Sequence, residues 1–221
     1  MVDVATQRLN MVDSQVLTSD VTDRRILRAM RELPRERFVP GPMAALAYID
    51  EAVPISPAGS DRRWLLAPRI EAKLLQLADV GADDSVLVVG AGTGYTASIL
   101  AGMARAVLAL ESDDKLAVEA RRNLAELALT NVKVDVGILV AGCTSKAPFD
   151  AIVLPGAVSW VPDALFDQLK DGGRLVAVVT EGGIGKATLW RRLGRSVDSW
   201  GAFDATAPML PGFAKTTEFV L

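Results

Sequence analysis

The stretch SVLVVGAGTGYTASILA (residues 85–101) joins an apolar run, a glycine-rich turn and a segment that favours a helix. The uncharged run from Ser85 to Ala104 is 20 residues long, enough to span a bilayer, but four glycines interrupt it. A buried strand over 85–89, a tight turn and a helix over 95–103 explain the pattern better than a membrane span. We therefore expect a ligand-capable turn at the end of a buried strand.

Alternating strands and helices extend this pattern along the chain. A second buried strand is predicted at 105–110, and further strands at 132–136, 149–154 and 174–180. Helices are predicted at 69–77, 113–129 and 162–169, the last closed by Gly172 and Gly173. The succession predicts an α/β fold, a doubly wound and mostly parallel sheet with helices on both faces. Late antiparallel strands, including KATLWRRL (186–193) and TTEFVL (216–221), are expected to follow.

The N-terminal part has a different character. Helices are predicted at 21–31 and 43–48, and five prolines between positions 34 and 57 indicate an irregular but fixed path. No linker rich in Gly or Ser divides the chain. We expect a single domain over residues 1–221, with an N-terminal helical segment at 1–64 and a core at 65–221.

Composition excludes several classes of protein. The chain has 221 residues, half of them apolar, and its 24 basic and 27 acidic residues give a net charge of −3, which does not favour nucleic acid or an anionic membrane. No histidine is present, so Ser-His-Asp and Cys-His catalysis and His-bearing zinc sites are excluded. The only cysteine, Cys143, suits a reducing compartment, and the polar N-terminus lacks a signal-peptide pattern; we expect a cytoplasmic protein.

Glycine spacing narrows the choice of ligand. A dinucleotide fingerprint has its third glycine five positions after the first, whereas these glycines stand at 90, 92 and 94, and the Gly-Lys pair of a Walker A loop is absent here. Glu111 ends the next predicted strand, 21 residues after Gly90, where an acid can bind two ribose hydroxyls. The combination favours an adenosine-containing cofactor. The alternatives are a nicotinamide oxidoreductase and a glycine turn that holds no ligand.

Six segments add a more specific pattern: PRERFVP (34–40), EAVPI (51–55), VLVVGAGTGYTASILA (86–101), LALES (108–112), APFDAIVL (147–154) and LFDQLKDGGRLVAVV (165–179). In their order and spacing the chain resembles the protein-L-isoaspartate O-methyltransferases, a family of class I methyltransferases that depend on S-adenosylmethionine. The resemblance covers most of the chain. It implies a Rossmann-like methyltransferase sheet, with the N-terminal helical segment on the side of the substrate.

The resemblance also implies a reaction. Enzymes of this family transfer a methyl group from S-adenosylmethionine to the carboxylate of isomerised aspartyl residues, which repairs aged proteins and leaves S-adenosylhomocysteine. No metal is required, and a carboxylate nucleophile is ionised at neutral pH, so the missing histidine fits. The expected partner is a protein or peptide with isoaspartyl residues, not nucleic acid or a membrane. The implied cofactor-binding residues are Gly90, Ala91, Gly92, Thr93, Gly94, Tyr95, Glu111, Ser112, Ile138 and Leu139.

Four positions depart from the family pattern, each toward fewer polar contacts. Leu66 stands where the family has its active-site serine, and Val88 where it has an acid that helps to hold the cofactor's amino group. The family's Gly-Asp-Gly is Gly137-Ile138-Leu139, and its small-residue turn is Pro155-Gly156-Ala157. The departures leave open an alternative function, a catalytically inactive family member that retains the fold as a binding or interaction module.

The catalytic residue therefore stays unassigned from the sequence. The loop before Leu66 holds Ser60 and Asp61, weak candidates for replacing the lost hydroxyl. Basic and aromatic side chains nearby could bind an acidic substrate. These substrate-binding candidates are Arg62, Arg63, Trp64 and Arg69.

Overall fold

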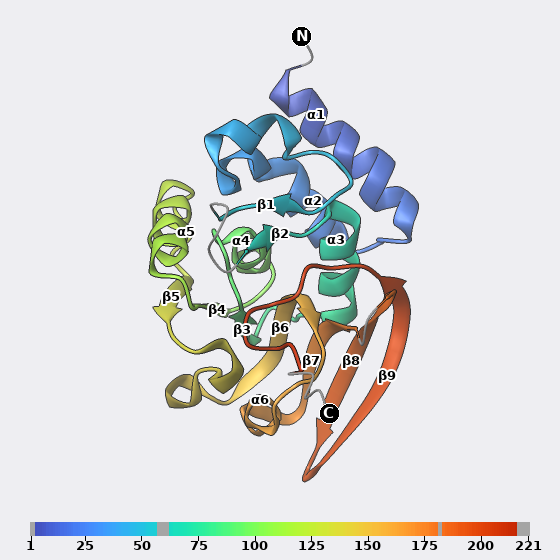
Figure 1. Ribbon diagram of the computed structural model, residues 1–221, viewed down its shortest axis with the longest axis vertical. Coiled ribbons are helices and arrows are strands. Elements are labelled where there is room, and N and C mark those ends of the chain that lie inside the picture. Colours follow the sequence, from blue (N-terminus) through green and yellow to red (C-terminus); the bar gives the residue numbers. More distant parts are fainter. Residues whose placement is uncertain (1–2, 57–61, 181–182, 216–221) are drawn as a thin grey trace, which may run out of the picture.

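The computed structural model describes residues 3–56, 62–180 and 183–215. Its centre is a seven-stranded sheet in the order β5-β4-β3-β6-β7-β8-β9 (Figure 1). Two further short strands, β1 (Val53–Pro54) and β2 (Trp64–Leu65), pair antiparallel beside it. The strands of the main sheet are β3 (Ser85–Val89), β4 (Ala106–Glu111), β5 (Val132–Val136), β6 (Phe149–Val158), β7 (Leu169–Val179), β8 (Gly185–Leu193) and β9 (Ser196–Ala205).

The strand order sets the place of the glycine-rich turn. β3 pairs parallel with both β4 and β6, and the parallel pairs β4–β5 and β6–β7 extend the sheet outward. From β3 the chain moves out through β4 to β5 and then returns to the other side of β3 at β6. The turn after β3 thus lies at the switch point of a doubly wound sheet, where ligands bind in such folds.

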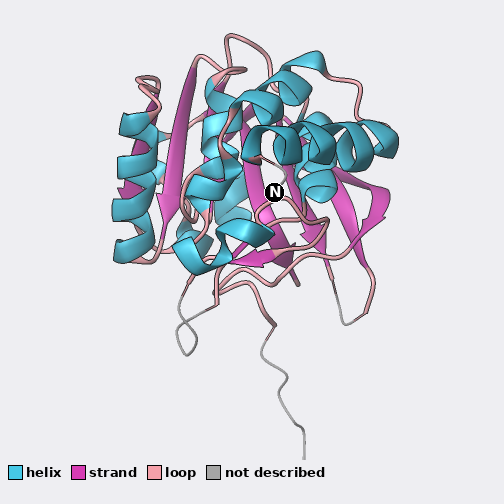
Figure 2. Ribbon diagram, turned by 90° about the horizontal axis from the view of Figure 1, so that it is seen from above, coloured by secondary structure: helices cyan, strands magenta, loops and turns pink. Residues whose placement is uncertain are grey.

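Both faces of the central strands β3, β4 and β6 are buried, which explains their apolar sequences. Val86 and Val88 of β3 point into one core cluster, while Leu87 and Val89 point into the other. Helices lie on both sides of the strands (Figure 2). The helices α3 (Pro68–Ala78), α4 (Tyr95–Ala101) and α5 (Asp114–Glu126) bury apolar residues in the first cluster or contact its strands, and α6 (Asp163–Asp167) contributes to the second.

The N-terminal segment packs on the same side as α3 and α4. Helix α1 (Val4–Met11) continues through a π-helical stretch (Val12–Val16), and α2 (Arg24–Glu32) starts at Asp23, whose carboxylate accepts a hydrogen bond from the Arg25 N–H. Such a cap satisfies one free donor of the first turn. Met11, Ile26 and Phe38 of this segment are buried in the first core cluster, so it forms a continuous core with the sheet.

Short 3-10 turns make up much of the remaining connections. They span Leu17–Ser19, Arg35–Phe38, Gly41–Leu46, Leu139–Ala141 and Thr144–Lys146. The prediction of a short helix at 43–48 is thus close in position, but the element is a 3-10 helix that starts earlier. None of the helices in the described ranges is long and apolar enough to cross a membrane.

The predicted α/β architecture is confirmed, with corrections at particular elements. The five strands predicted between residues 85 and 180 all occur, and 186–193 falls in β8. The helix predicted at 162–169 ends at Asp167, and Gly172 and Gly173 do not close it; they lie inside β7. β7 begins early because Leu169 pairs with Phe149 of β6, and the register shifts before Arg174 pairs with Ala151. Residues 216–221 lie outside the described residues.

At the far side of the sheet β7, β8 and β9 are antiparallel, and β9 forms the edge. Ala187 pairs with Phe203 while Thr188 pairs with Gly201, so Ala202 is an extra residue that makes a β-bulge. In Figure 1 the dark red segment after β9 turns back across the sheet.

Residues 206–213, which we call the C-terminal strap, are fixed to the end of β6. The Ala157 N–H donates to the Pro208 carbonyl at 2.8 Å, and the Leu210 N–H donates to the Ala157 carbonyl at 2.8 Å. The Ser159 N–H donates to the Phe213 carbonyl at 2.9 Å, and the Phe213 side chain is fully buried in the second core cluster. The strap is therefore part of the core rather than a loose tail.

Replacing Phe213 with alanine tests this anchoring. Because the ring is fully buried, we expect Phe213→Ala to lower the free energy of unfolding by about 3–5 kcal/mol. The exposed Val118 of α5 provides the control, and we expect Val118→Ala to change it by less than about 0.5 kcal/mol. Urea denaturation of the two variants measures both values. Equal, small effects would show that the strap does not pack as described.

Candidate active site

The glycine-rich turn joins β3 to α4 at the carboxyl end of the sheet. Gly90, Gly92 and Gly94 have φ angles of 86°, 56° and 97°, a region that L side chains rarely adopt. The N–H groups of Gly90 and Ala91 both donate to the Leu110 carbonyl of β4, at 2.8 and 3.0 Å. The turn is thereby held against the end of β4, where Glu111 stands.

The Glu111 carboxylate is surrounded by hydrogen-bond donors of the chain itself. Its Oε2 accepts from the Gly92 N–H at 2.6 Å, and its Oε1 accepts from the N–H groups of Ser112 at 2.7 Å and Asp113 at 3.1 Å. The Ser112 hydroxyl adds a longer contact of 3.3 Å. A carboxylate has about four acceptor sites. Glu111 is thus nearly saturated before its ion pair is counted.

That ion pair comes from Arg63, immediately before β2. Arg63 Nη2 lies 2.9 Å from Glu111 Oε2, and the two side chains are 3% and 0% exposed. Arg63 is itself placed by its backbone, because its N–H donates to the Ser56 hydroxyl and its carbonyl accepts from the Ile55 N–H. The sequence analysis expected Arg63 to meet an acidic substrate, whereas the structure pairs it with Glu111.

Side chains of the protein also cover the glycines. A methyl group added at Gly90 would lie 3.0 Å from Arg63 Nη2 and 3.0 Å from Leu210 Cδ2 of the strap. The same addition at Gly92 would meet Ile55 Cδ1 at 2.6 Å. Leu210 also fills the space over Gly156, where an added methyl group would lie 2.6 Å from Leu210 Cγ. The cavities left beside the turn measure about 10 Å³ each.

This arrangement does not fit an adenosyl cofactor in the conformation observed. A ribose diol needs free acceptor sites on Glu111, and those sites are taken by N–H groups and by Arg63. A nucleoside also needs far more room than about one water-sized probe, which is what a cavity of about 10 Å³ holds. The residue types match the expected site, but the chain itself fills the space between them.

Other predicted cofactor residues face different partners. The Thr93 hydroxyl donates to the Phe38 carbonyl at 2.6 Å, and the Tyr95 ring packs against Phe38 with ring centroids 5.1 Å apart. Leu139 is buried in the second core cluster, whereas Ile138 is 71% exposed. The site prediction for these residues stays a prediction.

The departures from the family pattern divide into core and surface. Val88 is fully buried in β3, and Leu66 is buried at the start of the connection to α3. Both side chains are members of the first core cluster, so each packs as an ordinary apolar residue. Ile138 does not, since it lies on the surface. Two of the four expected departures, Leu66 and Val88, therefore serve packing.

The remaining candidates separate in space. Ser60 and Asp61 lie outside the described residues. Arg62 is exposed, while Trp64 is half-buried and lines both narrow cavities beside the turn. Arg69 lies apart from them, pairs with Asp50 at 3.3 Å, and lines a larger cavity.

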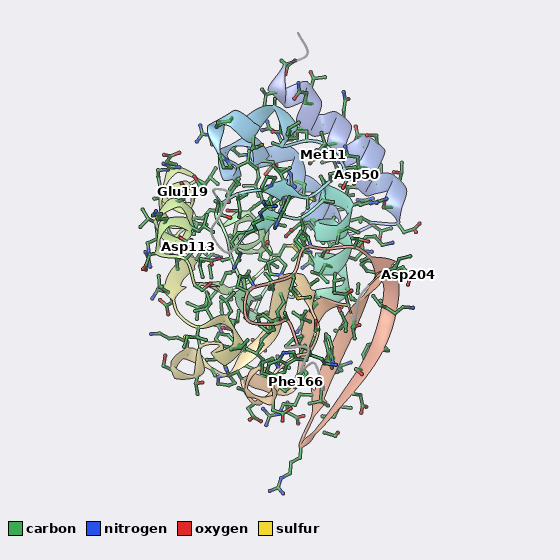
Figure 3. All side chains as sticks on the ribbon, viewed as in Figure 1. Met11, Asp50, Asp113, Glu119, Phe166 and Asp204 are labelled. Atoms are coloured by element: carbon green, nitrogen blue, oxygen red, sulfur yellow. The ribbon has the colours of Figure 1, made fainter. Side chains whose placement is uncertain are left out.

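That larger cavity, of about 570 Å³, borders the first residues of the strap. Arg69 and Lys73 of α3 form part of its wall, and Asp50 and Asp204, both labelled in Figure 3, lie on its border. Lys73 Nζ lies 4.4 Å from the centroid of the Phe203 ring, a cation–π contact. Its volume falls in the range of ligand pockets.

Behind the turn the structure holds a buried polar group that the sequence analysis missed. Arg35 is fully buried, with its Nε donating to the Ala47 carbonyl at 2.7 Å, its Nη2 donating to the Leu66 carbonyl, and its guanidinium 4.8 Å from the centroid of the Tyr95 ring. Glu71 of α3 is 1% exposed, and neither of its carboxyl oxygens has a hydrogen-bond partner among the described residues.

A signal for Glu71 was present in the sequence. It stands three and four positions before Leu74 and Leu75, on the apolar face of the predicted helix. Burial raises the pKa of the Glu71 carboxyl above its usual range, and the nearby Thr96 hydroxyl and Arg35 guanidinium oppose this shift only in part. An acid in such a position is a candidate for a functional role as well as a cost to stability.

Comparisons with known proteins now give these features a context. The doubly wound sheet with a glycine turn and a strand-end acid at its switch point defines a Rossmann-like fold of the methyltransferase class. The sequence model of the family "Protein-L-isoaspartate(D-aspartate) O-methyltransferase (PCMT)" matches residues 7–197. The chain belongs to the protein-L-isoaspartate O-methyltransferase family.

Individual relatives agree with this assignment. The chain is 40% identical over 169 residues to protein-L-isoaspartate O-methyltransferase 2 of Shewanella sediminis (strain HAW-EB3), covering 76% of this chain and 68% of the relative. It is 39% identical over 214 residues to the protein-L-isoaspartate O-methyltransferase of Methylorubrum extorquens (strain PA1), covering 95% and 91% of the two chains.

Solved structures support the fold. A protein-L-isoaspartate O-methyltransferase superposes with a TM-score of 0.80 at 23% identity, over 94% of this chain and 66% of that one, so this chain spans just under two thirds of its length. A Plasmodium falciparum structure described as a protein-L-isoaspartate O-methyltransferase, in complex with S-adenosyl-L-homocysteine, gives 0.75 at 20% identity, over 92% and 97%.

The buried Glu71 gives a test by pH. The pKa of Glu71 is raised in the folded protein above its ordinary value of 4.5. The contribution of this carboxyl to the free energy of unfolding is therefore complete below pH 4.5, and it is lost as pH rises through the pKa of the folded protein. We expect Glu71→Gln to unfold at a higher temperature than the parent at pH 8 and at nearly the same temperature at pH 5. Thermal melts followed by circular dichroism measure the difference.

The exposed Glu32 of α2 supplies the matched control. We expect Glu32→Gln to leave the melting temperature almost unchanged at both pH values. A Glu71→Gln protein that melts lower than its parent at pH 8 would contradict the burial of an unpaired acid and would point to a stabilising ionised carboxylate.

Proposed function

We propose that this chain is an S-adenosylmethionine-dependent methyltransferase that transfers a methyl group to the carboxylate of isomerised aspartyl residues, as a step in protein repair. Its cofactor is S-adenosylmethionine, its product is S-adenosylhomocysteine, and no metal takes part. The substrate is a protein or peptide with isoaspartyl residues. The acidic net charge and the single Cys143 support a cytoplasmic protein that does not bind nucleic acid or membranes.

The observation that carries the proposal is the family match over residues 7–197, which contains both the glycine turn and Glu111. The turn and the acid stand together at the switch point, the position where ligands bind in this class of sheet. The candidate cofactor residues are accordingly Gly90 to Tyr95, with Glu111 and Ser112. Ile138 and Leu139 stay weaker candidates, since one is exposed and the other belongs to the core.

The cavity of about 570 Å³ is the candidate site for the peptide substrate. It lies between the N-terminal segment and the strap, and its wall carries both the basic groups of Arg69 and Lys73 and the acidic groups of Asp50, Glu51 and Asp204. Arg69 is paired with Asp50 at 3.3 Å, so a carboxylate of the peptide would take the place of Asp50 on the guanidinium. The aromatic ring of Phe203 and the side chain of Ile70 add apolar surface for neighbouring residues of a peptide.

A second candidate function is a family member that keeps the fold as a binding or interaction module without methyl transfer. The observation in its favour is the filled space beside the turn, where Arg63 pairs with Glu111 and Leu210 covers Gly90. The family serine position is also the buried Leu66, which offers no hydroxyl. The two candidates differ in whether labelled methyl groups reach a peptide.

The test is methyl transfer from labelled S-adenosylmethionine to an isoaspartyl peptide. We expect a base-labile labelled ester on that peptide and none on the same peptide with normal aspartate. Glu111→Ala should abolish transfer, because it removes the acid at the end of β4. Glu119→Ala on α5 is the control and should keep the parent activity, since Glu119 has no place in the site.

Each variant must first be shown to be folded by circular dichroism, because removing one partner of a buried ion pair costs about 3–5 kcal/mol. Absence of labelled ester from the folded parent, even at high enzyme concentration, would reject isoaspartyl methyl transfer and favour the second candidate. Transfer that persists in folded Glu111→Ala would reject the assignment of Glu111 to the cofactor.

A further inference from the structure

We propose that Arg63 and Leu210 form an internal plug that competes with the cofactor, so that the cofactor binds only to a minor, opened form of the protein. The inference rests on the proposed function, since it concerns the cofactor of that reaction. It adds a device built from two segments far apart in the chain, the approach to β2 and the C-terminal strap.

The first half of the plug is electrostatic. Arg63 reaches Glu111 at 2.9 Å in a site from which solvent is almost excluded. The same Glu111 oxygen accepts the Gly92 N–H at 2.6 Å, so this oxygen links the guanidinium to the glycine turn. A ribose diol would have to take the acceptor sites that Arg63 now uses. Arg63 must therefore leave before a ribose can bind.

The second half of the plug is apolar. The Leu210 side chain packs against Gly90 and Gly156. Its backbone is held by the hydrogen bond from its N–H to the Ala157 carbonyl. Met209 forms an isolated parallel bridge with Ala157, so the strap lies beside the end of β6. The strap occupies the space that opens beyond the end of β3. The Leu210 side chain therefore packs on the glycines in the place of a ligand.

The two halves contact the same glycine, which makes them one device. A methyl group added at Gly90 would lie 3.0 Å from Arg63 Nη2 and 3.0 Å from Leu210 Cδ2. Both side chains also line a narrow cavity of about 10 Å³. Removal of either one should open part of the same space. Two single substitutions in different segments can therefore test a single mechanism.

The expected effect follows from the share of open molecules. The apparent dissociation constant equals the intrinsic constant divided by the fraction of protein that is competent to bind. If the plug keeps about one molecule in a hundred open, the parent binds about a hundredfold more weakly than an unplugged variant. A substitution that opens only one half of the plug should recover at least about tenfold of that loss.

The experiment is calorimetric titration of the full-length protein with S-adenosylhomocysteine, a product that cannot turn over. The variants are Arg63→Met, which keeps the aliphatic part and removes the charge, and Leu210→Ala, which leaves the ion pair intact. Arg195→Met is the matched control, because Arg195 is exposed in the turn between β8 and β9. Circular dichroism verifies that each protein is folded, and Leu210→Ala serves if Arg63→Met does not fold.

We expect both plug variants to bind at least about tenfold more tightly than the parent and Arg195→Met to bind like the parent. Equal affinity in all four proteins would overturn the plug and leave the proposed function standing. No heat with any protein at millimolar ligand would overturn the plug as well, and it would also reject the proposed cofactor. A gain in Arg195→Met equal to that in Arg63→Met would overturn the plug by showing a general charge effect.

Discussion

The Glu111 carboxylate is the group on which the arrangement of the site depends. It stands at the end of β4, accepts N–H groups from the glycine turn and from its own following turn, and pairs with Arg63 from the approach to β2. Three segments that are distant in sequence thus converge on two oxygen atoms. A buried charge of this kind is tolerated only when its hydrogen bonds and ion pair are complete. That requirement fixes where the turn and β2 lie.

The strands of the sheet could be predicted from the sequence because buried parallel strands have a strong local pattern. Strand patterns ending at Val89, Leu110 and Val136 located three neighbouring strands, and the glycine turn marked the switch point. Gly172 and Gly173 misled because a glycine pair after a helix is typical of a cap. In the folded chain the pairing of Leu169 with Phe149 places both glycines inside β7. That pairing joins segments that local sequence patterns do not connect.

The candidate site was predictable in its residue types but not in its contacts. Glu111 and the glycines could be placed from spacing, since each stands at the end of a strand. The partner of Glu111 could not, because nothing in the neighbourhood of Arg63 indicates which acid it meets. Leu210 is harder still, since an apolar residue in a coil segment gives no sign of the glycine it covers. The buried Glu71 is different, because its helical position already placed it inward.

The edge formed by β9 has a consequence for how the molecule behaves in a crowded solution. An edge strand offers unpaired backbone groups that can template pairing with another chain and lead to aggregation. β9 carries Asp198 and Asp204, and the bulge at Ala202 bends it out of a regular strand. The opposite edge, β5, carries Lys133 and Asp135. Charge on both margins and a bend on one oppose growth of the sheet beyond a single molecule.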